Sequence, residues 1–248
     1  TFNATPDAGG RLLLHFGAVD YRAQVWVNGE LVAEHEGGNT PFSADITASL
    51  VPDAEQIVVV RAEDHAGDVT QPRGKQDWLE TPHAIWYHRT TGIWQAVWLE
   101  PVPAIFIEEL QFTPDIASGS VKVEAGFNRA SGATLMLTLK VGEQLLARQY
   151  VLAQGDRVET NVVIPALRNG VHRDHLLWTP DRPNLVNVAA QLINDSGEEI
   201  DAVDSYFGLR TTSIGNGRFL LNDRPVFIRS VLEQGYWPQS HLAAPSAD

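Results

Sequence analysis

Short runs of strand-forming residues, separated by turn signals, fill nearly the whole chain, and this pattern limits the fold more than any other feature. The stretch AQVWVNGELVAEH (23–35) places Asn28-Gly29 between two alternating runs. Asn-Gly accepts positive φ at both turn positions, so it predicts a tight β-hairpin. Further strands are predicted in RLLLHFGAVD (11–20), EQIVVVRAED (55–64) and GIWQAVWLEPV (92–102). Because helical periodicity is missing here, residues 1–103 are predicted to form an antiparallel β-sandwich.

A second set of strand patterns follows Pro101 and Pro103. Its members are AIFIEELQFTP (104–114), SVKVEAGFN (120–128), ATLMLTLKVGEQLLARQYVL (133–152), RVETNVVIP (157–165) and LVNVAAQLINDSGEEIDAVDSYFGLR (185–210). Strands at intervals of about ten residues predict an Ig-like sandwich of about 100 residues. The chain has no cysteine, so this sandwich would lack the disulfide of antibody domains. The predicted fold class is all-β.

The last segment, 211–248, has a different character. FLLNDRPVFI (219–228) predicts a small hairpin that turns on Asn222-Asp223. VFIRSVL (226–232) is a dense apolar run, typical of a strand buried on both faces of a parallel sheet. APSAD (244–248) resembles a helix start, with Ser246 or a neighbour as the cap. These signals predict half of a β/α unit, as if the chain were cut at the start of a barrel or doubly wound domain.

Charge and cysteine content exclude several functions. The net charge of -13 argues against nucleic acid, because phosphate binding needs a basic face. No apolar run approaches the roughly 18 residues of a membrane-spanning helix, and no basic amphipathic segment indicates a membrane surface. Without cysteine, thiol catalysis and cysteine-ligated metals are excluded. His172 and His175 lack a metal-ligand pattern, so no metal and no cofactor is expected. The sequence does not decide between a cytoplasmic and an exported protein.

The stretch QPRGKQDWLETPHAIWYHRTTGIWQ (71–95) gathers tryptophans, histidines and basic side chains. Aromatic rings cover the flat C–H faces of sugars, and polar forks bind their hydroxyls. Lys75, Gln76, Asp77 and Trp78 therefore form a candidate carbohydrate-binding group in a loop. The alternative is structural packing, and for Trp94 and Trp98 we favour it, with both indoles facing inward from strands.

Several stretches together resemble glycoside hydrolase family 2, which includes β-galactosidases, β-glucuronidases and β-mannosidases. LHFGAVDYRAQVWVNGELVAEHEGGNTPFSADIT (14–47), PRGKQDW (72–78) and RTTGIWQAVWLEPV (89–102) resemble its N-terminal sugar-binding domain. LLWTPDRPNLVNV (176–188) and YFGLRTTSI (206–214) resemble its Ig-like second domain, and FLLNDRPVFIRSVLEQGYWP (219–238) resembles the entry to its (β/α)8 barrel. The resemblance implies a jelly-roll, galactose-binding-like sandwich over 1–103, an Ig-like sandwich over 104–210, and a linker with the first barrel strand over 211–248.

The resemblance also implies roles for particular residues. The loop with Lys75 to Trp78 would border the substrate pocket, and Arg229 would lie beneath two catalytic glutamates. Tyr236 and Trp237 would line the pocket, because barrel active sites form at the carboxyl ends of the strands. Both glutamates lie on later strands, so none of the catalytic residues is expected before Asp248. Some β-galactosidases have an aspartate where this chain has Trp86, so a galactoside specificity is not implied.

Three functions remain open on the sequence. The first is the non-catalytic part of a retaining β-glycosidase, whose partners would be a β-glycoside substrate and its own missing barrel. The second is a stand-alone carbohydrate-binding module, and the third is a structural stalk. The barrel-like segment 219–238 favours the first, since neither a lectin nor a stalk needs it. The resemblance further implies a homo-oligomer assembled through the accessory domains.

Overall fold

The computed structural model describes residues 1–4, 9–168 and 173–246, which fold into two compact units. The first unit comprises Thr1–Ala104 with Val231–Asp248, and the second comprises Ile105–Ser230. Strands dominate both units, so the all-β prediction is confirmed. Within the described residues, no helix combines the length and apolarity needed to span a membrane.

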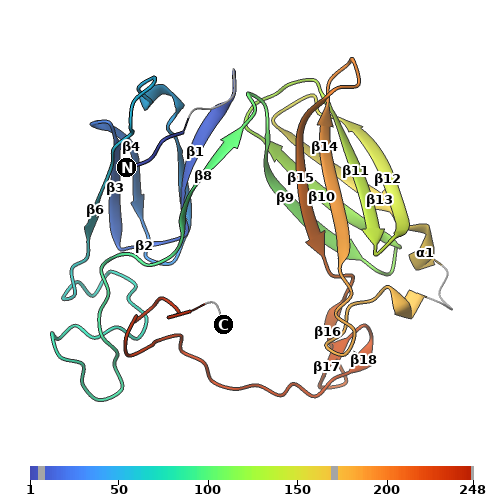
Figure 1. The fold of residues 1–248 in the computed structure, drawn as a ribbon. Coiled ribbons are helices and arrows are strands. Elements are labelled where there is room, and N and C mark those ends of the chain that lie inside the picture. The colour runs from blue at the N-terminus through green and yellow to red at the C-terminus, as the bar shows by residue number, and fades with distance from the viewer. Residues whose placement is uncertain (5–8, 169–172, 247–248) are drawn as a thin grey trace. The chain divides into compact units, whose positions relative to one another are not determined.

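Two three-stranded sheets and a two-stranded ribbon make up the first unit (Figure 1). Its strands are β1 (Arg11–Phe16), β2 (Val19–Asp20), β3 (Arg22–Val27), β4 (Glu30–Glu36), β5 (Phe42–Asp45), β6 (Val58–Glu63), β7 (Gly92–Ile93) and β8 (Val97–Val102). The sheets have the antiparallel orders β5-β1-β8 and β4-β3-β6, and β2 pairs with β7. One 3-10 helix, Thr47–Ser49, follows β5. The finer jelly-roll topology stays a prediction.

The core of the first unit lies between its two three-stranded sheets. Alternate residues of β1 and β3 are buried, as a strand with one covered face requires. The buried members are Leu12, Leu14, Phe16, Val19, Ala23, Val25, Val27, Ala44 and Ile46. Since both sheets contribute to this cluster, the unit is a β-sandwich.

The predicted hairpin at Asn28-Gly29 is confirmed, and a buried side chain reinforces it. Asn28 and Gly29 have φ of 51° and 89°, as a tight hairpin turn requires. The Asn28 amide nitrogen donates to Gln56 Oε1 at 2.6 Å, and Asn28 Oδ1 accepts from the Ile57 backbone N–H at 2.9 Å. Gln56 is only 2% exposed, and it also exchanges hydrogen bonds with the backbone of Val51. The turn is thereby tied to the segment before β6.

The second unit is a larger sandwich (Figure 1). Its strands are β9 (Ile107–Asp115), β10 (Ser120–Phe127), β11 (Thr134–Val141), β12 (Gln144–Leu152), β13 (Arg157–Val163), β14 (Val186–Ile193) and β15 (Glu199–Phe207). The antiparallel sheets have the orders β13-β10-β9 and β12-β11-β14-β15. One short helix, α1 (Pro165–Arg168), and a 3-10 helix, Arg173–His175, lie between β13 and β14.

Facing rows of aliphatic side chains form the core of the second unit. Leu135, Leu137 and Leu139 of β11 are fully buried, and they belong to one cluster with Val121 and Val123 of β10. The two sheets therefore pack face to face, as in Ig-like sandwiches. This apolar contact takes the place of the antibody disulfide.

The segment after the second sandwich departs from the prediction in part. The hairpin at Asn222-Asp223 is confirmed, since β17 (Arg218–Leu221) pairs with β18 (Arg224–Pro225) beside β16 (Thr212–Gly215). The strand predicted at 226–232 does not form, and Phe227 and Val231 are 85% and 90% exposed. A strand covered on both faces needs neighbours to supply its hydrogen bonds, and none of the described strands pairs with it. The start of a barrel is therefore not seen. The expected helix start also fails, because 244–246 are not helical and 247–248 lie outside the described residues.

Candidate functional site

A long irregular connection leaves β6 and returns to β7, and we call its residues 71–91 the aromatic loop (Figure 1). Its two arms meet at a parallel bridge between Gln76 and Tyr87. The Asp77 N–H donates to Tyr87 O at 2.8 Å, and the Tyr87 N–H donates to Lys75 O at 2.9 Å. These two bonds fix the base of a loop that has no other regular structure.

Asp77 holds the tip of the loop from inside. It is 1% exposed, and its carboxylate accepts from the backbone N–H of Leu79 at 3.0 Å and of His83 at 2.7 Å. The imidazole Nδ1 of His83 lies 2.7 Å from the same carboxylate. Burial by itself would raise the pKa of Asp77, but the hydrogen bonds from Leu79 and His83 outweigh it and lower the pKa below 3.8. Substrate contact by Asp77 stays a prediction, and its oxygens are already engaged within the loop.

Acid is expected to release this loop. Because the folded pKa of Asp77 is lowered, its carboxylate stabilises the loop above the ordinary value of 3.8 and loses that effect as the pH falls below it. We expect the tryptophan emission to shift red as the pH falls below 3.8, before the sandwiches unfold. The Asp77→Asn variant should show the shifted emission already at neutral pH. A variant with the same acid transition as the unsubstituted chain would contradict this role for Asp77.

Gln76 connects the loop to the sandwich beneath it. It is 6% exposed, its amide nitrogen donates to Asp20 Oδ2 at 2.8 Å, and its Oε1 accepts from the Thr90 N–H at 2.5 Å. Both polar ends of the side chain are thus used inside the protein. Sugar contact by Gln76 stays a prediction. Its observed hydrogen bonds anchor the aromatic loop to the sandwich.

The exposed part of the loop combines indoles with cations. Trp78 is 39% exposed and meets Trp86 edge to face at 5.4 Å. The Arg73 guanidinium lies 4.9 Å from the centre of the Trp78 ring, and Lys75 Nζ lies 5.3 Å from that of Trp86. Cations over ring faces at such distances hold the rings in place. Of the four predicted loop residues, Lys75 and Trp78 are the two whose side chains reach solvent.

The structure brings Tyr236 and Trp237 to the same loop. The Tyr236 ring stacks on Tyr87 at 4.3 Å with an angle of 3°, and its hydroxyl accepts from the Lys75 N–H at 3.2 Å. Trp237 is half-buried and forms two backbone bonds with His241, whose imidazole stacks on His88 at 5.1 Å. A hollow of about 270 Å³ lies between Tyr87 and residues 232–236. The contact between Tyr87 and Tyr236 was not predicted, because no local signal pairs residues so far apart in the sequence.

Arg229 belongs to the second unit and is exposed, so it does not lie on a strand buried on both faces, as the sequence predicted for 226–232. It lines a groove of about 910 Å³ together with Trp178, Arg210 and Phe227. The cause is the missing strand, because 226–232 is not enclosed by a sheet. A role of Arg229 in substrate binding stays a prediction.

The two tryptophans expected to face inward behave differently. Trp94 is half-buried, and its indole N–H donates to Gly38 O at 2.7 Å. Trp98 is 46% exposed and stacks on His15 at 4.8 Å, so the inward placement is wrong for it. The register explains this, since Leu99 packs on the core and the alternation of β8 turns Trp98 outward.

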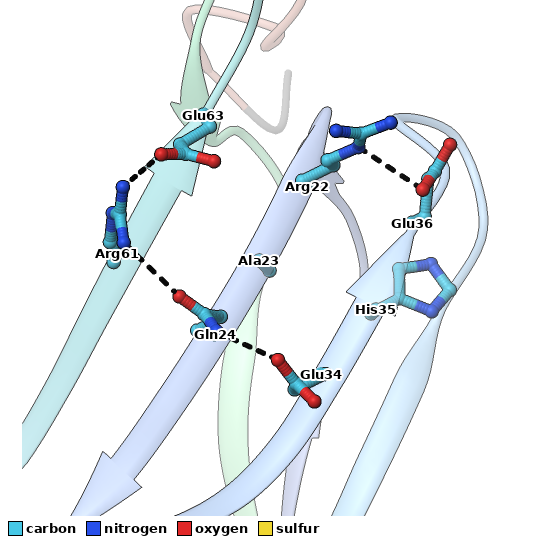
Figure 2. A pocket seen from close by; sticks show the side chains of 8 residues that line it. All are labelled: Arg22, Ala23, Gln24, Glu34, His35, Glu36, Arg61 and Glu63. Atoms are coloured by element: carbon cyan, nitrogen blue, oxygen red, sulfur yellow. Dashed lines mark hydrogen bonds and ion pairs between the residues drawn. The ribbon is translucent and has the colours of Figure 1, made fainter.

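The outer face of the sheet β4-β3-β6 carries a different kind of hollow, of about 490 Å³ (Figure 2). Arg61 contacts Glu63 and Gln24, and Gln24 donates to Glu34 at 2.7 Å. Arg22 and Glu36 pair at 3.1 Å on the same face. The charged side chains of this face pair with one another and remain hydrated. We therefore describe it as a solvated sheet face rather than a ligand site. Among the described residues no group of three or more His, Cys, Asp or Glu is suited to a metal, and His172 lies outside them.

Two consecutive β-sandwiches, the first bearing a loop of indoles, cations and amides, define an all-β protein. A model of the glycosyl hydrolases family 2 sugar binding domain matches residues 6–103, and one described as glycosyl hydrolases family 2 matches 105–210. The chain belongs to glycosyl hydrolases family 2, and the resemblance stated from the sequence is confirmed.

Relatives agree on the family and are much longer than this chain. The β-galactosidase of Thermoanaerobacter pseudethanolicus is 27% identical over 240 residues, which cover 96% of this chain and 31% of that protein. The β-glucuronidase of Paenibacillus borealis is 25% identical over 90% of this chain and 37% of its own length. The solved Lactobacillus rhamnosus β-glucuronidase shares the fold with a TM-score of 0.73 at 23% identity, over 98% of this chain and 40% of that one. The chain thus spans about a third of the curated relatives it matches.

Proposed function

We propose that this chain is the non-catalytic N-terminal part of a retaining β-glycosidase that hydrolyses O-glycosidic bonds in carbohydrate metabolism. In this proposal the sandwiches are accessory domains, and the aromatic loop forms part of the rim of the substrate pocket. The observation that supports it is the group formed by the exposed Trp78 with the half-buried Trp86, Arg73 and Lys75, on a loop with an internally bonded base.

The chemistry of this group suits a sugar at a rim. Indole rings cover C–H faces, while the Lys75 ammonium and Arg73 guanidinium donate to hydroxyl or carboxylate oxygens. Asp77 and Gln76 fix the base of the loop. Binding a sugar therefore costs little conformational entropy for ordering the loop. Tyr236, Trp237 and Arg229 are proposed as further pocket residues of the intact protein.

The catalytic step is assigned to the rest of the parent protein. Retaining hydrolysis uses two carboxyl groups about 5 Å apart, one as acid/base and one as nucleophile. Relatives of this family named β-galactosidase and β-glucuronidase extend well past the region matched here. We therefore propose β-glycosides as the substrate class, with galactosides and glucuronides as the first probes.

The proposal predicts binding without turnover. The purified chain should release no 4-nitrophenol from 4-nitrophenyl β-D-glucuronide or β-D-galactoside, and should bind the methyl glycosides with Kd of about 1 mM or weaker. Trp78→Ala should weaken that binding by about tenfold, as expected for loss of one aromatic contact. Tryptophan fluorescence titration measures it. Trp98→Ala is the matched control, because Trp98 is 46% exposed, against 39% for Trp78, and lies outside the loop.

Other outcomes would select another function. Turnover by the pure chain would contradict the non-catalytic assignment. If Trp78→Ala and Trp98→Ala lowered the glycoside affinity equally, the aromatic loop would not be part of the binding site. Micromolar binding by the chain alone would favour the stand-alone carbohydrate-binding module, since an accessory rim supplies only part of a pocket.

A further inference from the structure

Asp20 is a buried carboxylate that the function described so far does not use. It ends β2, is 3% exposed, and accepts a hydrogen bond from the Gln76 amide nitrogen at 2.8 Å. A carboxylate removed from water is costly unless charges or several hydrogen bonds compensate. Here the compensation comes from a neutral amide that belongs to the aromatic loop.

The Gln76 side chain links Asp20 to both arms of the aromatic loop. Its nitrogen reaches Asp20, and its oxygen accepts from Thr90 on the returning arm at 2.5 Å. Its own backbone lies between Lys75 and Asp77, which carry the two bonds to Tyr87. The Lys75 N–H also donates to the Tyr236 hydroxyl. One buried amide thus joins the sandwich to the loop, and the neighbouring backbone N–H of Lys75 bonds Tyr236.

The turn between β4 and β5 closes over the carboxylate. A Cβ placed on Gly38 would lie 2.3 Å from Asp20 Oδ1, so a side chain there would displace the Asp20 carboxylate. The Gly38 carbonyl is fixed in turn by the Trp94 indole N–H at 2.7 Å. Asp20 is therefore confined to a position from which it reaches Gln76.

The charge at this position is unfavourable for stability. Burial raises the pKa of Asp20, the Gln76 hydrogen bond lowers it, and nearby Asp64 raises it again. Among the titratable groups around it, Tyr236 also has a raised pKa, through burial first and through Asp20 in part. An asparagine would accept the same hydrogen bond without a buried charge. Residues that lower stability in this way are frequent at functional sites.

We propose that Asp20 is a positioning residue, which holds the aromatic loop and its Tyr87–Tyr236 stack in the binding arrangement through Gln76. The inference rests on the proposed function, because the loop is there the rim of a glycoside pocket. Asp20 itself is not assigned a contact with the sugar. Its effect is carried by the hydrogen bond to Gln76.

The test compares Asp20→Leu, Asp20→Asn and, as a control, Asp68→Asn, a half-buried carboxylate bonded to Thr70. Near-UV circular dichroism and acrylamide quenching report the loop, and fluorescence titration with methyl β-D-glucuronide and methyl β-D-galactoside reports binding. Asp20→Leu should lose the aromatic dichroism of the loop and about tenfold or more in affinity. Asp20→Asn should retain the loop signal and keep affinity within about threefold, because it retains the acceptor. Asp68→Asn should change neither.

The outcomes separate this inference from the proposed function. Unchanged dichroism and quenching in Asp20→Leu would overturn the positioning role, even if the glycosides bind. If the unsubstituted chain binds neither glycoside, the proposed function fails, while the loop signal still decides the role of Asp20. Should Asp20→Leu not fold, Gln76→Leu tests the same bond from the other side. A Gln76→Leu chain with the full loop signal would likewise overturn it.

Discussion

Replacing Leu137 with alanine is expected to lower the free energy of unfolding of the second unit by about 2–5 kcal/mol. Leu137 is fully buried on β11, between β12 and β14, in the sandwich core. Truncation removes apolar contacts and leaves a cavity that two fixed sheets cannot close. No disulfide is available to limit the loss. Native-state hydrogen exchange of the β11 amides measures the effect within this unit.

The matched control is Leu152→Ala on the neighbouring strand β12. Leu152 is 51% exposed, so its truncation should cost less than about 1 kcal/mol. Equal losses from the two variants would show that the four-stranded sheet does not bury β11 as described. A large loss confined to Leu137 would support the sandwich core as the main source of stability.

Replacing Gln56 with alanine is expected to destabilise the first unit by about 2–4 kcal/mol. The Gln56 side chain is 2% exposed and bonds Asn28 Nδ2, the Val51 N–H and the carbonyls of Val51 and Ala54. Alanine would remove these four hydrogen bonds at once and leave a cavity, and Asn28 Nδ2 would retain only its bond to the Ser49 carbonyl. Denaturant titration, followed by amide exchange of β3 and β6, measures it.

Gln24→Ala supplies the comparison for this change. Gln24 bonds Glu34 on the solvated face shown in Figure 2, so water can replace its partners and the loss should stay within about 0.5 kcal/mol. A Gln56→Ala chain as stable as Gln24→Ala would contradict the proposal that this buried amide holds the Asn28-Gly29 turn to the sandwich.

Local sequence was sufficient for the strands of the two sandwiches and for both tight turns. The alternating runs on either side of Asn28-Gly29 predicted the strands β3 and β4, because side chains of a strand point to opposite sides. Asn28-Gly29 and Asn222-Asp223 predicted hairpins, because these residues tolerate the positive φ that the turns require. The family resemblance, carried by several motifs in order, was confirmed by the family models.

The same local rules failed where a residue depends on distant neighbours. VFIRSVL has the pattern of a buried strand, yet a strand requires partners for its N–H and C=O groups, and the described residues offer it none. Trp98 was expected to pack inward from its strand, but alternation along β8 places it on the outer face. Gln76 and Asp77 had the side chains of sugar ligands, and the fold has enclosed both.

The sequence by itself determined the all-β class, the alternation that buries one face of each strand, and the two hairpin turns. These depend on steric limits and side-chain direction within a few residues. Only the tertiary structure decided which polar groups remain available to a ligand. Asp20 meets Gln76 across 56 positions, and Tyr236 meets Lys75 across 161. The physical reason is that burial, and with it the cost of an unpaired polar group, is set by residues that approach only when the chain has folded.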